Sequence, residues 1–313
     1  MAPSAARRIA ALDVGTNTVL MLVVERRPDG TLVPLADMAR ITRLGRGVER
    51  TGHLDPAAAR ATLDAIVEFA NRARELEAES IVAVATAALR DVADGAAFLT
   101  RVREEAGIEL TVISGETEAQ LSYLAVVRGL GLDASGRLLI VDIGGGSTEF
   151  IRVEPGAELQ AFSLQLGSVR LTERHIHHDP PAPGEVAALR ATIDAAIDSL
   201  NWSYRPDLMV GIAGTATTVC AVALKLVAYD SNLVHGYRLS RGEVGRSLEL
   251  FGTLPNQQRR LLPGLAEGRV DVIFAGTAIL ERVMARFDVE QVVISDQGVR
   301  WGLAWRELER AGS

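Results

Sequence analysis

The sequence ALDVGTNT at residues 11–18 and the sequence IVDIGGGSTE at residues 140–149 decide the fold. Each is an apolar run that ends in an aspartate, Asp13 or Asp142, and continues into a short turn of small and hydroxyl residues. A second apolar run then leads to a glutamate, Glu25 or Glu154, which in both cases lies twelve residues after the aspartate. This pattern is typical of a tight β-hairpin. The chain therefore contains two similar hairpins.

The segments that follow the two hairpins repeat one order of predicted elements. After the first hairpin, the pattern predicts a third strand near 32–44, then helix 56–78, strand 80–85, helix 91–106, strand 110–113 and helix 117–128. After the second, it predicts a third strand near 159–166, helices up to 204, strand 208–212, helices after Gly214 including 270–287, strand 291–294 and helix 299–310. Both halves read βββαβαβα. We therefore expect an α/β protein with one domain over 1–126 and another over 127–297, and a final helix, 298–313, that packs back on the first domain.

Length and composition agree with two globular domains. The chain has 313 residues, of which 48% are hydrophobic and 23% are charged, values that exclude a mainly disordered protein. No apolar stretch reaches the ~18 residues of a membrane span, and the N-terminal segment lacks the pattern of a signal peptide. The single cysteine, Cys220, excludes a disulfide framework and a cysteine-based zinc site. We expect a cytoplasmic protein with no membrane partner.

The chain is acidic overall, and almost all of its basic residues are arginines. The net charge is −7, which argues against a nucleic-acid partner bound through global charge. Lys225 is the only lysine among the 33 basic residues, so the rest are arginines, whose planar guanidinium suits phosphate. An anionic ligand held by local arginines therefore stays possible.

Further motifs carry a resemblance to a known family. They are VATAALR at 84–90, ISGETEA at 113–119, LQLGSVRLTE at 164–173, RVDVIFAGTAILE at 269–281 and SDQGVRWG at 295–302. With residues 142–149, they resemble the exopolyphosphatase/guanosine pentaphosphate phosphohydrolase (Ppx/GppA) family, in the family's order, from about residue 9 to about 305. The resemblance implies two actin-like (hexokinase-type, ribonuclease H-like) domains facing an interdomain cleft.

The same resemblance carries expectations about activity. It implies Mg²⁺-dependent hydrolysis of the terminal phosphoanhydride of inorganic polyphosphate, and a homodimer. Where the family often has Ser-Asn-Ser, this chain has Thr16-Asn17-Thr18, which keeps the hydroxyls. Where the family often has Asp-Arg-Gly, this chain has Gln297 in place of the arginine. The long C-terminal extension of larger family members is not expected.

The two turns are candidate phosphate sites. Backbone N–H groups in a glycine-rich turn can form a concave anion nest, and hydroxyl and amide side chains add donors. A helix that begins at Gly214 would offer a third anion site at its N-terminus. Ordinary hairpin turns favour the same residue types, which is the structural alternative. The predicted phosphate-binding residues are Gly15, Thr16, Asn17, Thr18, Gly144, Gly145, Gly146, Ser147, Thr148, Gly214 and Thr215.

The candidate catalytic residues are three carboxylates and an arginine. Asp142 sits at a strand end beside a turn, as does Asp13, and Mg²⁺ takes one or two carboxylates together with waters and phosphate oxygens. The resemblance implies Glu118 as general base, with Glu149 orienting water or metal, and Arg90 holding phosphate at the start of a helix. The alternatives are that Asp13 and Asp142 cap turns, that Glu118 caps a helix with Ser114, and that Arg90 is a surface residue.

Other features have plainer interpretations. The segment from His175 to Asp179 is predicted to be a polar helix end rather than a metal cluster, and Cys220 a core residue. The arginines from Arg40 to Arg50 could line a path for a polyanion or could form a solvated face. For function, the alternatives to an exopolyphosphatase are a guanosine pentaphosphate 5′-phosphohydrolase, a small-molecule kinase of the same fold and a sensor that binds guanosine tetraphosphate.

Overall fold

The computed structural model describes residues 7–310, leaving out 91 and 134. These residues divide into two compact units. The first unit contains the residues up to Ala125 together with those from Val299 onward, and the second is Val126–Gly298. The chain therefore passes from one unit to the other twice, once within helix α5 (Gly115–Leu130) and once between Gly298 and Val299.

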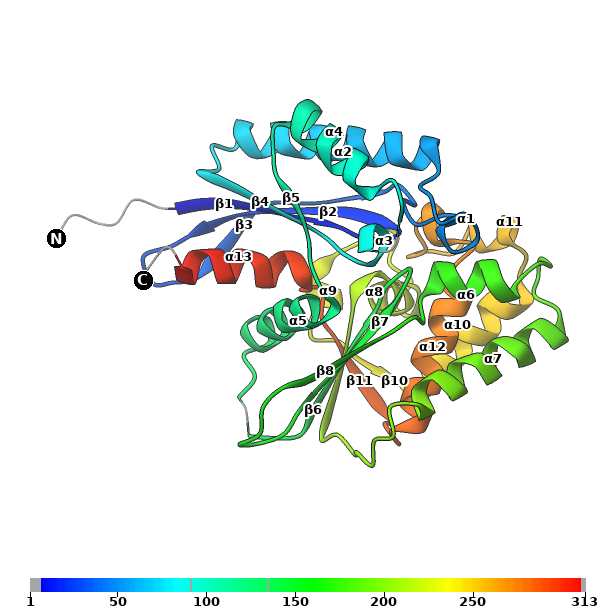
Figure 1. Ribbon diagram of the computed structural model, residues 1–313. Coiled ribbons are helices and arrows are strands. Elements are labelled where there is room, and N and C mark those ends of the chain that lie inside the picture. Colours follow the sequence, from blue (N-terminus) through cyan, green and yellow to red (C-terminus); the bar gives the residue numbers. More distant parts are fainter. Residues whose placement is uncertain (1–6, 91, 134, 311–313) are drawn as a thin grey trace. The chain divides into compact units, whose positions relative to one another are not determined.

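Among its described residues, the first unit has a five-stranded sheet in the order β3-β2-β1-β4-β5 (Figure 1). Strands β1 to β3 are antiparallel to one another, whereas β4 runs parallel to β1 and β5 parallel to β4. The strands are β1 (Arg7–Val14), β2 (Thr18–Arg26), β3 (Leu32–Ile41), β4 (Ser80–Ala85) and β5 (Leu110–Val112). The helices besides α5 are α1 (Val48–Thr51), α2 (Pro56–Glu75), α3 (Ala87–Arg90), α4 (Gly95–Ala106) and α13 (Val299–Arg310).

Strand β1 is buried on both faces because helices cover the sheet on each side. Leu12 and Val14 belong to a core with residues of α2 and α4, whereas Ile9 and Ala11 belong to a second core with residues of α5 and α13. Figure 1 shows α2 and α4 on one side of this sheet and α13 on the other. Alternation along the strand explains the pattern, since successive side chains point to opposite faces. The C-terminal helix is therefore part of the core of the first unit.

The second unit has a six-stranded sheet among its described residues, in the order β10-β11-β9-β6-β7-β8. The strands are β6 (Leu138–Ile143), β7 (Thr148–Val153), β8 (Gln160–Leu164), β9 (Leu208–Ile212), β10 (Arg238–Ser240) and β11 (Gln291–Ile294). The helices are α6 (Ser168–His175), α7 (Pro183–Asp198), α8 (Ala213–Ala223), α9 (Ser231–Val234), α10 (Arg241–Thr253), α11 (Asn256–Arg259) and α12 (Ile273–Arg286), with a 3₁₀ turn at Glu267–Arg269. Helix α12 supplies much of this core, including Ile279, Leu280 and Val283.

The two units repeat one topology. Without the added edge strand β10, the order β8-β7-β6-β9-β11 matches β3-β2-β1-β4-β5. The registers agree as well, since Val14 pairs with Val19 in the first hairpin and Ile143 pairs with Thr148 in the second. Both turns close with one hydrogen bond of 3.0 Å, from Gly15 N to Thr18 O and from Gly144 N to Ser147 O. The predicted fold class, an α/β protein of two actin-like βββαβαβα units, is confirmed.

Some element boundaries differ from the sequence-based prediction. The helix predicted over 91–106 begins only at Gly95, a separate short helix, α3, precedes it, and residue 91 lies outside the described residues. The intervening backbone bonds elsewhere, because Ala93 N donates to Gly52 O and Leu54 N donates to the carboxylate of Asp94. Arg90 therefore ends a helix, and the prediction that it opens one was wrong. Strand β10, only three residues long, was not predicted.

The length and hydropathy of the helices bear on whether any of them could span a membrane. Within the described part of the chain, no helix combines the length and the apolar character needed to cross a membrane.

Candidate active site

Three neighbouring parallel strands of the first unit end at one edge of its sheet. Val14 of β1 pairs with Ala85 of β4, which pairs with Val112 of β5. The segments that leave this edge carry the first turn, then Arg90, then Glu118. In α/β sheets, ligands bind beyond the carboxyl ends of parallel strands. The fold therefore brings the predicted residues of the first unit to one edge of one sheet.

The first turn, residues 15–18, is held by the segment that follows β3. Thr42 N and Arg43 N both donate to Asn17 O at 3.0 Å, and Gly45 N donates to Thr16 O at 2.8 Å. Arg43 has a φ of 58°, a left-handed conformation that is strained for a residue with a side chain. The turn's carbonyl groups are thus used within the fold. Within the described residues, the N–H groups of Thr16 and Asn17 have no acceptor, as an anion nest requires.

The side chain of Asn17 gives independent evidence for a ligand. It is 6% exposed, and neither its Oδ1 nor its Nδ2 has a hydrogen-bond partner among the described residues. Burying an amide without a partner costs about 1–3 kcal/mol, so such groups usually serve a function or hold a molecule from outside the chain. Asn17 is therefore well suited to donate to a bound phosphate oxygen.

Glu118 and Arg90 form an ion pair. The Arg90 Nη2 atom lies 2.8 Å from Glu118 Oε2, and both side chains are largely buried. Arg90 Nε is also buried and has no partner among the described residues. Ser114 caps α5, because its Oγ accepts a hydrogen bond of 3.1 Å from Thr117 N, whereas Glu116 is exposed. The capping role that was the alternative for Glu118 thus belongs to Ser114.

The face of the sheet beneath Glu118 is the one to which Asp13 points. Asp13 alternates with Ile9 and Ala11 along β1, and these pack in one core with Leu121 and Ala125 of α5. Asp13 is 9% exposed and lies opposite Leu20 in the sheet. Its position offers one carboxylate on the same face as the proposed base.

The second turn, residues 144–147, is held by the N-terminus of helix α6. Ser168 N donates to Gly144 O at 2.9 Å, and Val169 N donates to Gly145 O at 2.9 Å. The side chain of Arg170 also donates, from Nε to Gly146 O at 2.9 Å. No acceptor is found for the N–H groups of Gly145 and Gly146 in the part of the chain that the structure describes. The second turn thus has the same property as the first.

The hydroxyl of Thr148 has a different role from the one predicted. Its Oγ1 donates to Leu166 O, and the residue is fully buried. A hydroxyl has one proton to donate, so this side chain fixes β7 to the segment before α6 instead of donating to phosphate. Ser147, at 3% exposure, is the hydroxyl of the second turn without such a bond among the described residues.

Asp142 and Glu149 lie directly opposite each other on β6 and β7. They are 6% and 1% exposed. Two like charges facing each other across a sheet repel, and buried charges need compensation. A hard divalent cation could provide it, since Mg²⁺ takes one or two carboxylates and completes its shell with water and phosphate oxygens. Among the described residues, no three or more His, Cys, Asp or Glu side chains come together in a way that could hold a metal ion.

The predicted third anion site is at the start of α8. Ala213 there has a φ of 64°, and a Cβ added at Gly214 would collide with the guanidinium of Arg269. Burial lowers the pKa of Arg269 to about 10. Thr215 is 2% exposed and packs against Gly276 of α12. A cation thus lies beside Gly214, and Arg269 was not among the predicted site residues.

The histidine-rich segment caps a helix. Glu185 accepts hydrogen bonds of 2.9 Å from the backbone N–H groups of His177 and Ala182, and its Oε1 lies 2.9 Å from His178 Nδ1. The His178 bond, together with these backbone bonds, lowers the pKa of Glu185 to about 2. These contacts fix the start of α7.

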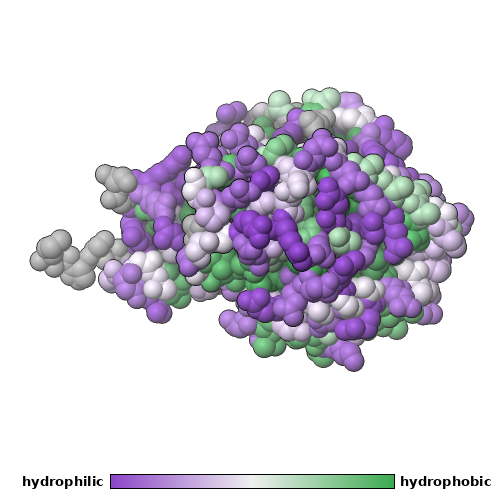
Figure 2. Space-filling view, turned by 90° about the horizontal axis from the view of Figure 1, so that it is seen from below, coloured by the Kyte–Doolittle hydropathy of each residue, from purple (hydrophilic) through white to green (hydrophobic). Residues whose placement is uncertain are grey.

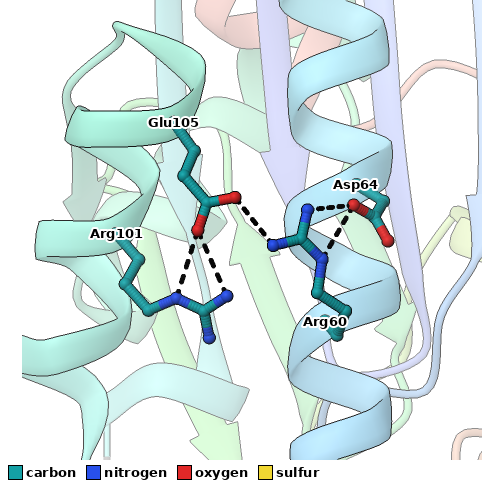
Figure 3. A network of polar contacts seen from close by, with 4 residues as sticks. All are labelled: Arg60, Asp64, Arg101 and Glu105. Carbon is teal, nitrogen blue, oxygen red and sulfur yellow. Dashed lines mark hydrogen bonds and ion pairs between the residues drawn. The ribbon is translucent and has the colours of Figure 1, made fainter.

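Many surface arginines are paired with carboxylates. Figure 3 shows Arg60 of α2 between Asp64 and Glu105, with Arg101 of α4 on the same Glu105. Arg40 is likewise bonded to both oxygens of Glu68, at 2.8 and 2.9 Å. Figure 2 shows hydrophilic residues over much of the face in view, interrupted by smaller hydrophobic areas. Arg40 is therefore committed to a protein partner, while Arg46 and Arg50 are exposed.

Comparisons with known proteins show the family of the chain. The model of the Ppx/GppA phosphatase family matches residues 23–311. Exopolyphosphatase 2 of Mycobacterium tuberculosis (strain CDC 1551 / Oshkosh) is 32% identical over 312 residues, which cover 95% of this chain and 97% of that protein. The guanosine-5′-triphosphate,3′-diphosphate pyrophosphatase of Vibrio atlanticus is 30% identical over 308 residues, covering 96% of this chain and 59% of that protein.

A solved structure agrees as well. The crystal structure of the Aquifex aeolicus member of the Ppx/GppA family superposes with a TM-score of 0.83 at 30% identity, covering 98% of this chain and 99% of the other. The matching family model, the extent of the sequence identity and the shared fold lead to one conclusion. The chain belongs to the Ppx/GppA phosphatase family.

Proposed function

We propose that this chain is an exopolyphosphatase, which hydrolyses the terminal phosphoanhydride of linear inorganic polyphosphate and releases orthophosphate. The observation that carries the proposal is the buried, facing pair Asp142 and Glu149 beside a turn whose N–H groups have no acceptor among the described residues. A pair of carboxylates suits a divalent cation, and a turn of this kind suits an anion. Membership of a family whose relatives include a protein named exopolyphosphatase supports the same reaction.

Both turns carry residues for which we propose a role in phosphate binding. We propose that the turn residues Thr16 and Asn17 in the first unit and Gly145 and Gly146 in the second bind phosphate oxygens through their N–H groups. Gly15, Thr18, Gly144, Ser147, Gly214 and Thr215 complete the proposed set. Holding the phosphates in place lowers the barrier by removing translational and rotational freedom before the reaction.

Glu118 is the proposed general base. A water molecule attacks the terminal phosphorus and Glu118 accepts its proton. The bond from this phosphorus to the bridging oxygen breaks, so that orthophosphate is released and the polyphosphate leaves one phosphate shorter. Arg90, which already lies 2.8 Å from Glu118, is proposed to bind an equatorial oxygen with its remaining N–H groups. Asp142 and Glu149 would hold Mg²⁺, which would neutralise charge on the phosphate oxygens. Asp13 of the first unit is a further candidate for a metal ligand.

A second candidate reaction is guanosine pentaphosphate 5′-phosphohydrolysis. The relative from Vibrio atlanticus, named for such a nucleotide, favours it, and the chemistry at phosphorus is the same. A kinase of this fold would require a nucleotide, and a guanosine tetraphosphate sensor would bind without turnover. We further propose a cytoplasmic homodimer that acts on free polyphosphate, as the family resemblance implies.

The test is phosphate release measured side by side on medium-chain polyphosphate and on guanosine pentaphosphate, without added nucleotide. Faster release from polyphosphate is expected, and no release from either substrate would exclude both phosphatase proposals. Glu118→Gln is expected to lower kcat by about 10²–10⁴-fold while the substrate still binds, because the amide cannot accept a proton.

Glu116→Gln is the matched control, since Glu116 lies two residues away on the same helix and is exposed. It should keep wild-type activity. A Glu118→Gln enzyme with more than about a third of wild-type kcat would remove Glu118 from the role of general base.

A further inference from the structure

Three polar residues form a row across the sheet of the second unit. Asp142 on β6 pairs with Glu149 on β7, and Glu149 pairs with Ser163 on β8. The Ser163 hydroxyl donates to Glu149 Oε1 at 2.7 Å. Glu149 is 1% exposed, whereas Ser163 belongs to an exposed position of the edge strand. The carboxylate of Glu149 thus has one oxygen fixed from the edge strand, on the side away from Asp142.

The corresponding row in the first unit has apolar residues in place of the glutamate and the serine. The register places Asp13 opposite Leu20 and Leu20 opposite Ala39. The two units share their topology and the closing bond of the turn, so Leu20 and Ala39 are the counterparts of Glu149 and Ser163. A leucine and an alanine therefore satisfy the fold at these positions. The polar pair in the second unit is there for another reason.

We infer that Ser163 is a positioning residue that holds Glu149 in its working orientation. The inference rests on the proposed function, in which Glu149 orients water or binds Mg²⁺. The hydroxyl bond to Oε1 restricts the rotation of the Glu149 carboxylate and so fixes the direction of both of its oxygens. Groups that bond to a metal ligand or a catalytic carboxylate from behind typically contribute 10–100-fold to metal affinity or activity. Ser163 acts through Glu149 and has no contact with substrate in this role.

The experiment measures steady-state hydrolysis and Mg²⁺ binding for two variants that lose the donor. Ser163→Ala removes the hydroxyl, and Ser163→Cys keeps a similar volume with a much weaker donor. Both are expected to lower kcat about tenfold with little change in KM for polyphosphate. Both should also raise the Mg²⁺ concentration that half-saturates the thermal shift of the free protein by about tenfold. Ser163→Thr keeps the hydroxyl on a β-branched side chain that strands accept, so it should restore both values.

A double variant tests whether Ser163 acts through Glu149. Ser163→Ala added to Glu149→Ala is expected to cause no further loss of Mg²⁺ binding or of kcat, because the acceptor of the Ser163 hydroxyl is already gone. Gln160→Ala, an exposed polar change on the same strand, is the control and should match the wild type. A folded Ser163→Ala protein with kcat and Mg²⁺ binding within twofold of wild type would overturn the inference, as would equal losses with and without Glu149.

The Mg²⁺ measurement separates this inference from the proposed function. If the wild-type protein releases no phosphate from either substrate, the proposed function fails, and the Mg²⁺ thermal shift of the Ser163 variants still decides the role of Ser163.

Discussion

The two hairpin turns occupy equivalent positions in their sheets but differ in what supports them and in what lies beside them. The first is held by a short irregular segment containing the strained Arg43, and the second by the N-terminus of a helix. Beside the first, Asp13 faces a leucine, whereas beside the second, Asp142 faces Glu149. The part of the repeat that exposes N–H groups is the same in both. The carboxylate chemistry at the sheet differs, so the two halves are not interchangeable.

The largest expected effect comes from the packing behind each turn. A Cβ at Gly167 would collide with the backbone of Gly145 and Gly146, whereas a Cβ at Gly45 would collide with the methyl group of Thr16. Backbone cannot move aside as a side chain can. Gly167→Ala should therefore abolish measurable phosphate release and lower Tm, while Gly45→Ala should cost about 1–3 kcal/mol of stability and keep some activity.

The check is paired activity assays and thermal melts. Thr16→Ser removes the obstructing methyl group, so it should rescue Gly45→Ala. No second-site change of that kind is expected to rescue Gly167→Ala. Equal losses in the two glycine variants would break the comparison between the turns.

The next effect concerns the two aspartates. Asp142→Asn removes one of two facing carboxylates. It should therefore weaken Mg²⁺ binding and lower kcat together. Asp13→Asn removes a carboxylate that faces Leu20. The loss of kcat should be about tenfold larger for Asp142→Asn, since an interaction with a charged group is worth roughly 1.5–3 kcal/mol. Mg²⁺ titrations of both variants measure this, and a larger loss in Asp13→Asn would reverse the assignment of the metal pair.

A smaller effect is expected at the side chain that distinguishes the turns. By register, Asn17 in the first turn corresponds to Gly146 in the second. Asn17→Asp places a negative charge where phosphate is proposed to bind and should raise KM about tenfold or more. Asn17→Gly copies the second turn and should raise KM only a few fold, because one donor is lost. If the two variants have the same KM, the Asn17 amide does not contact the substrate.

The smallest effect concerns acid stability and involves the second unit alone. The pKa of Glu185 is lowered from 4.5 to about 2, chiefly by the bond with His178. A carboxylate with a lowered pKa stabilises the folded state fully above pH 4.5, and this contribution disappears as the pH falls toward 2. Glu185→Gln should thus be less stable than the wild type near pH 6 and equally stable near pH 2. Chemical denaturation at both pH values measures the difference, and a constant difference would refute the ionic origin.

The sequence predicted the repeat because the pattern that encodes it is local. An apolar run, an aspartate and a glycine turn lie within ten residues, and turn geometry fixes the hairpin register. The position of Ser163 beside Glu149 could not be predicted, because it depends on the register of β8, which follows a longer connection. The division of α3 from α4 depends on two distant bonds, which Ala93 N donates to Gly52 O and Leu54 N donates to the Asp94 carboxylate. Arg269 reaches Gly214 only through tertiary packing.

The C-terminal helix has a consequence for synthesis on the ribosome. Trp301, Leu303 and Leu308 of α13 pack with Ile9 and Leu22 in the core of the first unit. The first unit therefore lacks one layer of its core until α13 has been made, whereas the second unit is a continuous segment that precedes α13 in the chain. Domains usually fold in the order of translation. In this chain the half whose synthesis begins first can complete its core only after α13 has been made, so Ile9 and Leu22 of β1 and β2 lack these packing partners until then.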